Sequence, residues 1–187
     1  PYHDANNGAS NFYWRNDGVG EFTDATVEVG LDQNNTKFSL VSIWEDFDDD
    51  GDVDLYVAND FGTNNLYRND GGRFTDVASE VGAEDMAAGM GLSTADFDLD
   101  GDMDLLITNM FSSAGQRIVP QTDLFMEGQN QEVHQHYGRH ARGNTLLANN
   151  GDGTFEDVTM AAGISVGGWS WGSKFVDFNN DGYADIY

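Results

Sequence analysis

The stretch DFDDDGDVD, residues 46–54, places six aspartates around one glycine. Carboxylates crowded this closely repel one another, so a folded chain has to neutralise them. Hard oxygen ligands in this number favour Ca²⁺, because Mg²⁺ keeps much of its water and softer metals prefer nitrogen or sulfur. Gly51 permits the sharp turn that such a loop needs. We therefore predict a calcium loop whose side-chain ligands are Asp46, Asp48, Asp50 and Asp54.

The stretch recurs twice, as DFDLDGDMD at 96–104 and DFNNDGYAD at 177–185. All three copies fit the pattern D-F-[DN]-x-D-G-x-x-D. The second copy offers Asp96, Asp98, Asp100 and Asp104, and the third offers Asp177, Asn179, Asp181 and Asp185. By analogy with other calcium loops, a backbone carbonyl at the seventh position adds a ligand, here at Asp52, Asp102 and Tyr183. The pattern predicts about three Ca²⁺ sites.

An EF-hand and a plain acidic turn are the two alternatives to a calcium-binding hairpin. An EF-hand requires a bidentate Glu at position 12 and a helix on each side. Position 12 is Val57 in the first copy and Ile107 in the second, and the flanking segments have strand character. A single acidic stretch could be a solvent-exposed turn. Three copies with Asp at positions 1, 5 and 9 and Gly at position 6 favour a shared ligand instead.

A second element repeats out of phase with the acidic stretches. Its copies are FYWRNDGVGEFTDATVEVG, LYRNDGGRFTDVASEVG and LLANNGDGTFEDVTMAAG, which begin at residues 12, 66 and 146. The acidic stretches begin at Asp46, Asp96 and Asp177, so the second interval holds an insertion of about 30 residues. Repeats of about 50 residues with strand-like content are typical of propellers.

Each repeat contains about four short runs rich in Val, Ile, Phe, Tyr and Leu. The run FSLVSIW at 38–44 alternates apolar with polar residues after Phe38, which is the period of a strand. Four strands per repeat is the content of a propeller blade. We therefore expect an all-β fold of four-stranded antiparallel blades with calcium-binding hairpin loops. Residues 1–187 would form one partial β-propeller of about 3.5 repeats, with 110–143 inserted between strands, and no long helix is expected.

Composition restricts the classes of function. The chain has 39% apolar and 12% aromatic residues, which is too rich for a disordered acidic segment. Its formal charge of -25 argues against nucleic acid or an anionic membrane surface as a partner. The absence of cysteine excludes disulfides and thiolate metal sites. No apolar window of roughly 18 residues predicts a transmembrane helix.

The acidic loops, together with the L-[YL]-x-N-[DN]-G…F-x-D-V segments, resemble FG-GAP or VCBS repeats over nearly the whole chain. That resemblance implies a seven-bladed, integrin-alpha-like β-propeller with calcium in its hairpin loops, of which this chain is a part. The segments MFSSAGQRI, HARGNTLLANNGDGTFEDVT and WSWGSKFVDFNNDG are similar to VCBS-repeat proteins of the ASPIC/UnbV and cartilage acidic protein group. Such proteins are typically exported, which implies an extracellular, cell-surface or periplasmic location and a role in binding and adhesion.

Three further sets of residues are candidates for chemistry. The insertion carries His134, His136 and His140, which could bind a transition metal or serve as polar surface groups. Three arginines in or near the insertion could pair with loop acids or bind an anionic sugar or carboxylate, namely Arg117, Arg139 and Arg142. The four tryptophans are expected to pack between blades rather than to stack on sugar rings, and are Trp14, Trp44, Trp169 and Trp171.

The sequence favours a binding function, namely adhesion or recognition of a glycan or protein ligand through the propeller face and the 110–143 insertion. No catalytic constellation emerges, so no catalytic residue is assigned. Two alternatives remain open. One is a structural subunit that self-assembles into a surface fibre or layer. The other is a polysaccharide-degrading enzyme on a propeller scaffold, which would need acid and base residues that are free of calcium.

Overall fold

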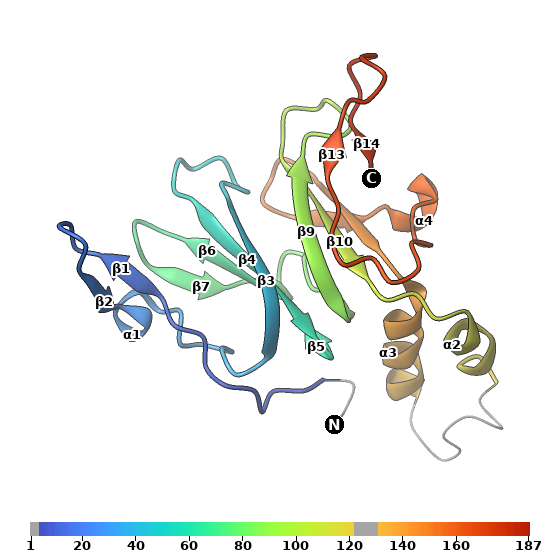
Figure 1. The fold of residues 1–187 in the computed structure, drawn as a ribbon, viewed down its shortest axis with the longest axis horizontal. Coiled ribbons are helices and arrows are strands. Elements are labelled where there is room, and N and C mark those ends of the chain that lie inside the picture. The colour runs from blue at the N-terminus through green and yellow to red at the C-terminus, as the bar shows by residue number, and fades with distance from the viewer. Residues whose placement is uncertain (1–3, 122–130) are drawn as a thin grey trace.

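A computed structural model describes residues 4–121 and 131–187 and contains two four-stranded antiparallel sheets (Figure 1). The first sheet has the order β3-β4-β6-β7, with β3 (Phe38–Glu45), β4 (Asp54–Asp60), β6 (Asn65–Asn69) and β7 (Phe74–Asp76). The second has the order β9-β10-β11-β12, with β9 (Gly89–Ala95), β10 (Asp104–Asn109), β11 (Thr145–Asn149) and β12 (Phe155–Asp157). The predicted four strands per repeat are confirmed in these two blade-like sheets.

Three two-stranded pairs accompany these sheets in the part of the chain that the structure describes. One joins β1 (Trp14–Asn16) to β2 (Phe22–Asp24), one joins β13 (Phe175–Val176) to β14 (Asp185–Ile186), and a small one joins β5 (Gly62–Thr63) to β8 (Met86–Ala87). The edge strand β3 of the first sheet contacts the edge strand β9 of the second, and β9 in turn contacts β13. The sheets therefore follow one another side by side, as Figure 1 shows.

The core lies between successive sheets. Tyr56 and Ala58 of β4 belong to the same buried cluster as Leu105 and Ile107 of β10. The alternate residues Leu55 and Val57 point the other way, into a second cluster beside β1 and β2. Because β4 is buried on both faces, it reads as a continuous apolar run rather than an alternating one. Each large apolar side chain buried here contributes on the order of 1.5–3 kcal/mol.

A glycine at one repeated position fixes how closely adjacent sheets approach. Gly82 has φ of +77°, and a Cβ placed on it would lie 2.7 Å from the carbonyl oxygen of Phe155 in the second sheet. Gly30 repeats the arrangement, with a Cβ position 2.6 Å from the carbonyl oxygen of Phe74. The backbone N–H of Phe155 donates to Val81 at 2.7 Å and joins the two sheets directly. Only glycine combines this backbone conformation with this contact.

Among the described residues the helices are short, with one exception that corrects the sequence prediction. Both α1 (Thr26–Val29) and α4 (Thr159–Ala162) are single turns. Between β10 and β11 lie α2 (Ser113–Ile118) and the 12-residue α3 (Gln131–Arg142), where no long helix was expected. Gly138 lowers the helix propensity of this segment, so its local signal is weak. Contacts with α2 and β8 stabilise the helix instead.

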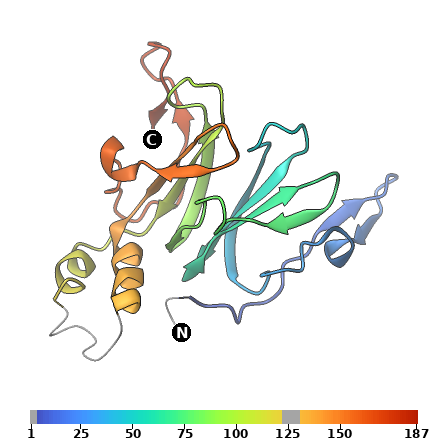
Figure 2. The ribbon, with the colours of Figure 1, turned by 180° about the vertical axis from the view of Figure 1, so that it is seen from behind.

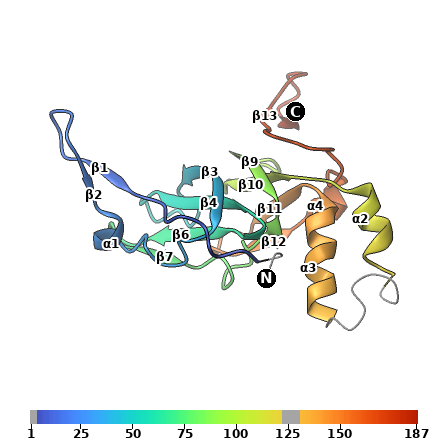
Figure 3. The ribbon, with the colours of Figure 1, turned by 60° about the horizontal axis from the view of Figure 1, so that its bottom comes forward.

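The insertion packs at the end of the sheets that is remote from the acidic loops (Figures 1 and 2). Figure 3 shows α3 beside α2, next to the second sheet. Gly115 of α2 allows close packing, because a Cβ there would lie 2.6 Å from Cβ of Ala141. Residues 122–130 of the predicted 110–143 insertion lie outside the described residues. Within the described ranges, no helix is long and apolar enough to cross a membrane.

Candidate metal centre

The three acidic stretches form hairpin loops at the same end of successive sheets (Figure 1). Loop 1 is residues 46–54 between β3 and β4, loop 2 is residues 96–104 between β9 and β10, and loop 3 is residues 177–185 between β13 and β14. Strand pairing brings each loop's two ends together, as between Glu45 and Asp54. The hairpin therefore keeps the carboxylates of each loop close together.

Loops 1 and 2 each gather three carboxylates. One oxygen from each of Asp46, Asp48 and Asp50 lies within 4.8 Å of the others, and the same holds for Asp96, Asp98 and Asp104. The Oδ1 atoms of Asp46 and Asp48 are buried and have no hydrogen-bond partner. Buried carboxylate oxygens without a partner are costly unless a cation binds them. The donor set consists of oxygens only, as a calcium site requires.

Backbone hydrogen bonds fix the shape of each loop. In loop 1 the N–H of Gly51 donates to Oδ2 of Asp46 at 3.0 Å, and the N–H of Asp52 donates to Oδ1 of Asp50 at 2.8 Å. Gly51 has φ of +93°, and Asp49, two residues before it, has φ of +56°. Leu99 occupies the same left-handed region in loop 2, with φ of +65°, although leucine disfavours it. The fold of the loop therefore imposes a backbone conformation that leucine disfavours by itself.

The closing aspartate of each loop makes contacts that the sequence did not reveal. Oδ2 of Asp54 accepts from the N–H of Phe47 at 3.0 Å, and Oδ1 accepts from the N–H of Asn69 at 2.8 Å. In loop 2, Asp104 accepts from Phe97 and Asn149, both at 2.9 Å. Burial raises the pKa of Asp54 and of Asp104 to about 6. These two predicted ligands therefore also hold the loop to the next hairpin of the same sheet.

Asn69 and Asn149 are the residues that sequence reasoning missed. Both begin the N-[DN]-G turn of the second repeated element, so the repeat itself carried a signal for them. The side-chain Nδ2 of Asn69 donates to the carbonyl of Val53 at 3.0 Å, and that of Asn149 donates to Met103 at 3.3 Å. Each asparagine thus contacts its own acidic loop through both backbone and side chain.

Loop 3 differs from the other two in its side-chain contacts. Asn179 replaces the third-position aspartate, and its Nδ2 donates to Oδ2 of Asp181 at 2.9 Å. Phe178 donates to Asp185 at 3.0 Å, so the closing contact is retained. Among the described residues, the triads of acidic ligand atoms form in loops 1 and 2. Of the predicted three sites, two are supported by such a triad, and the third stays a prediction.

The seventh-position residues adopt the same turn in all three loops. The N–H of Asp102 donates to Asp100 at 3.0 Å, and that of Tyr183 donates to Asp181 at 2.9 Å, as Asp52 does in loop 1. Oδ2 of Asp52 accepts from the N–H of Gly71 at 2.8 Å, so its side chain is turned to the neighbouring turn. Carbonyl coordination by these three residues remains a prediction.

The histidines and arginines of the insertion lie far from the acidic loops. His134, His136 and His140 stand on α3, and the described residues contain no metal-ligating triad that includes them. Arg139 pairs with buried Asp85 at 3.0 Å, and Arg142 pairs with Asp157 at 2.7 Å. Both arginines therefore contact acids of the sheet ends rather than loop acids.

The tryptophans are more exposed than predicted. The exposed fractions are 55% for Trp14, 45% for Trp44, 65% for Trp169 and 70% for Trp171. Trp44 packs edge-on against Phe74, with ring centroids 5.9 Å apart. Trp14 belongs to a two-stranded pair, which covers less surface than a four-stranded sheet. None of the four is buried as expected, although Trp44 does lie between the β1–β2 pair and the first sheet.

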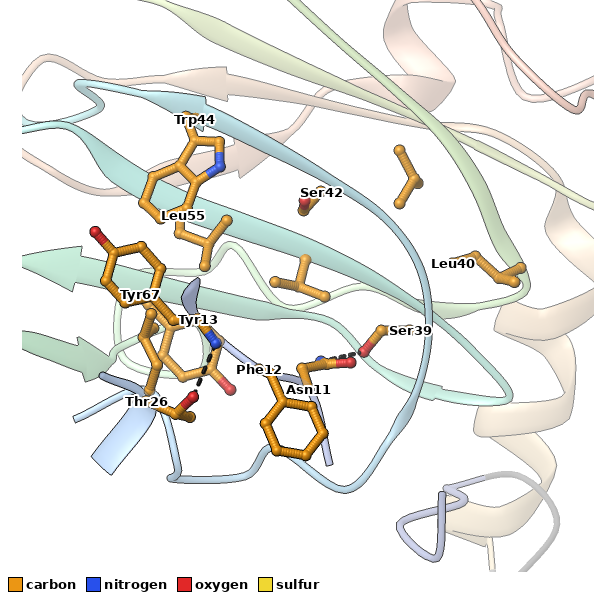
Figure 4. A pocket seen from close by; sticks show the side chains of 13 residues that line it. Asn11, Phe12, Tyr13, Thr26, Ser39, Leu40, Ser42, Trp44, Leu55 and Tyr67 are labelled. Atoms are coloured by element: carbon orange, nitrogen blue, oxygen red, sulfur yellow. Dashed lines mark hydrogen bonds between the residues drawn. The ribbon is translucent and has the colours of Figure 1, made fainter. Parts of the chain in front are cut away.

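Trp44 borders a hollow of about 410 Å³, lined by both apolar and polar side chains, between the β1–β2 pair and the first sheet (Figure 4). Figure 4 shows Tyr13 and Tyr67 on its wall, with Leu55 near Trp44. On the second sheet, the face equivalent to this wall carries Leu92 and Leu105, and the first sheet covers it. The hollow therefore occupies the position of a sheet-to-sheet contact.

A second hollow, of about 290 Å³, is lined almost wholly by polar groups at the end remote from the loops. Nζ of Lys37 donates to the carbonyl oxygen of Thr63 at 2.8 Å, and burial lowers the pKa of this lysine. Asp76 accepts from the side chains of Asn34 at 2.9 Å and Asn65 at 2.7 Å. The hollow combines donors and acceptors without a large apolar surface.

Comparison with known proteins agrees with the loop geometry. The family model described as FG-GAP-like repeat matches residues 46–107 and 121–187, which together contain all three acidic loops. No curated protein matches the chain. The matched segments make up more than half of the sequence, and they include both carboxylate triads. The chain belongs to the family of FG-GAP-like repeat proteins.

Proposed function

We propose that the chain forms calcium-stabilised blades of a β-propeller in an exported protein that recognises a ligand. The observation that carries the calcium part is the pair of buried, unpartnered oxygens on Asp46 and Asp48 inside an aspartate triad. Bound calcium would supply the positive charge that three adjacent carboxylates lack. The closing aspartates then join each loop to the next hairpin. A closer relationship to the ASPIC/UnbV and cartilage acidic protein group is part of this proposal and is supported by the sequence of the insertion.

Calorimetric titration tests the calcium part. The wild-type chain should bind one Ca²⁺ in each of loops 1 and 2 and a third in loop 3, and Mg²⁺ should compete poorly because it gives up its water reluctantly. Asp48→Asn should weaken calcium binding at loop 1, because it removes one of the three negative charges of the triad. Asp49→Asn is the matched control, because it removes the same charge from an exposed neighbour whose left-handed conformation asparagine tolerates. Equal losses in both variants would mean that general charge, rather than coordination, attracts the ion.

The recognition part rests on the polar hollow around Lys37. Lys37 stands where the next repeat has the buried Ala87, so the architecture of the sheet does not require a charged residue there. The hollow lies at the same end of the sheets as the insertion helices. Its side chains carry both hydrogen-bond donors and acceptors, which suits a hydrophilic ligand such as a glycan.

A glycan array with calcium-loaded protein tests the recognition part. Binding to a defined sugar should be lost in Lys37→Ala and kept in Lys174→Ala, a change at a lysine just before β13. If both variants are folded and calcium-loaded and bind the glycan equally well, the hollow around Lys37 is not the binding site.

A further inference from the structure

Loops 1 and 2 belong to different sheets, and one side chain contacts both. Asn149, at the end of β11, is 4% exposed. Its Nδ2 donates to the carbonyl oxygen of Phe47 in loop 1 at 2.8 Å and to that of Met103 in loop 2 at 3.3 Å. Its backbone N–H donates to Asp104, the closing residue of loop 2. Asn149 thus connects two loops that are about 50 residues apart in the sequence.

The contact with loop 1 falls between two candidate ligands. Phe47 separates Asp46 from Asp48, so the bonded carbonyl belongs to the segment that links them. The hairpin that begins at Asn149 makes a further contact with loop 1. The rings of Phe47 and Phe155, the first residue of β12, pack edge to face with centroids 5.7 Å apart. Gly153 of the same hairpin lies close to loop 1, since a Cβ added there would be 3.7 Å from Cβ of Asp48.

The first sheet contains an internal comparison. Asn69 repeats the contacts of Asn149 with its own loop, through the N–H to Asp54 and Nδ2 to Val53. Gly72 donates to Oδ1 of Asn69 at 2.8 Å, as Gly151 donates to Oδ1 of Asn149 at 3.1 Å. The bond from Asn149 to Phe47 is additional. Asn69 therefore shows what this asparagine does for its own loop, and the bond to Phe47 shows what Asn149 does in addition between loops 1 and 2.

We propose that Asn149 is a positioning residue that couples the calcium affinities of loops 1 and 2. This inference rests on the proposed calcium function. An ion in one loop orders that loop and fixes the hydrogen-bonded partners of Asn149. The second loop then loses less freedom when it binds, so its affinity rises. The link is a contiguous set of hydrogen bonds and packed rings, and it contains no titrating step.

A cycle of calorimetric titrations tests the coupling. All proteins carry Asp177→Asn and Asp181→Asn, which silence loop 3. Disabling loop 1 with Asp46→Asn and Asp48→Asn should weaken calcium binding by loop 2 on the order of tenfold. With Asn149→Ala present, disabling loop 1 should leave the affinity of loop 2 unchanged. In the matched control Asn69→Ala, the tenfold effect of disabling loop 1 should persist.

The outcomes separate this inference from the calcium function. If the wild-type protein binds no calcium, the proposed function fails. If loop 2 binds equally well whether loop 1 is intact or disabled, the sites are independent and the coupling is overturned. That comparison does not require the Asn149→Ala protein to fold. If coupling persists in a folded Asn149→Ala protein, as judged by near-ultraviolet circular dichroism, charge alone couples the loops and Asn149 has no such role.

Discussion

The Oδ1 atom of Asp54 accepts a hydrogen bond from the backbone N–H of Asn69 at 2.8 Å, so one carboxylate joins two successive hairpins of the first sheet. Asp104 and Asn149 repeat this relationship in the second sheet at 2.9 Å. Both carboxylates are almost completely buried, with exposed fractions of 1% and 0%. The acidic loops are therefore integral to the sheets rather than exposed appendages, and the consequences for stability can be measured.

Stability should depend on pH with opposite sign in the presence and absence of calcium. Burial raises the pKa of Asp54 and Asp104 to about 6, whereas an unfolded aspartate has a pKa of about 3.9. Between these values the calcium-free native state binds more protons than the unfolded chain. Its unfolding free energy should therefore fall as pH rises from about 4 to about 6. Calcium reverses the trend, because protons compete with it for the same carboxylates.

Urea unfolding at pH 4.5, 5.5 and 6.5, in calcium-free buffer and in excess calcium, measures these slopes. Asp54→Asn and Asp104→Asn together should flatten the calcium-free slope. The pKa of Asp157 is lowered, so this group stabilises the fold throughout the range from pH 4.5 to 6.5 and loses that effect only at lower pH. It therefore adds little to the slopes that are compared. A calcium-free stability that rises across the same window would contradict the burial argument.

Gly82→Ala should destabilise the protein more than Gly163→Ala. The two glycines occupy the same position in successive repeats and have φ of +77° and +73°. Both substitutions therefore carry a similar backbone cost, about 1 kcal/mol. Only at Gly82 would the new Cβ also meet the carbonyl oxygen of Phe155, at 2.7 Å, whereas no described atom lies within 4 Å at Gly163. Chemical denaturation should show an excess loss on the order of 1–3 kcal/mol for Gly82→Ala; equal losses would refute the close contact between sheets.

Arg139→Met should lower stability, because it leaves Asp85 without its charged partner. Asp85 is 1% exposed and is otherwise held by the side chain of Asn109 at 2.9 Å. Loss of a partner from a buried charge costs on the order of 2–3 kcal/mol. Arg68→Met is the control, because its pair with Asp70 is exposed on both sides and should be worth less than about 1 kcal/mol. Equal effects in thermal unfolding would show that Arg139 does not fasten α3 to the sheets.

The parts predicted from sequence are those in which a short segment determines its own structure. The D-x-D-x-D-G spacing and the apolar runs on either side fix hairpin and strand locally, so loops 1 and 2 could be predicted from their own residues. Helix α3 could not, because Gly138 weakens its local signal and its contacts with α2 and β8 are distant in sequence. The hydrogen bond from Asn149 to Phe47 spans 102 residues and follows from the packing of two sheets. The exposure of Trp169 and Trp171 likewise depends on which sheet lies beside them.

The central claim is that calcium completes the aspartate triads and thereby stabilises the sheets. Thermal unfolding of the chain in excess calcium, in EDTA and in excess magnesium tests it most directly. At calcium concentrations well above the dissociation constant, the midpoint should rise on the order of 10 °C over that in EDTA. Magnesium should give much less, Asp46→Asn with Asp96→Asn should lose most of the rise, and Asp49→Asn should keep it. An identical midpoint in calcium and in EDTA would contradict the account.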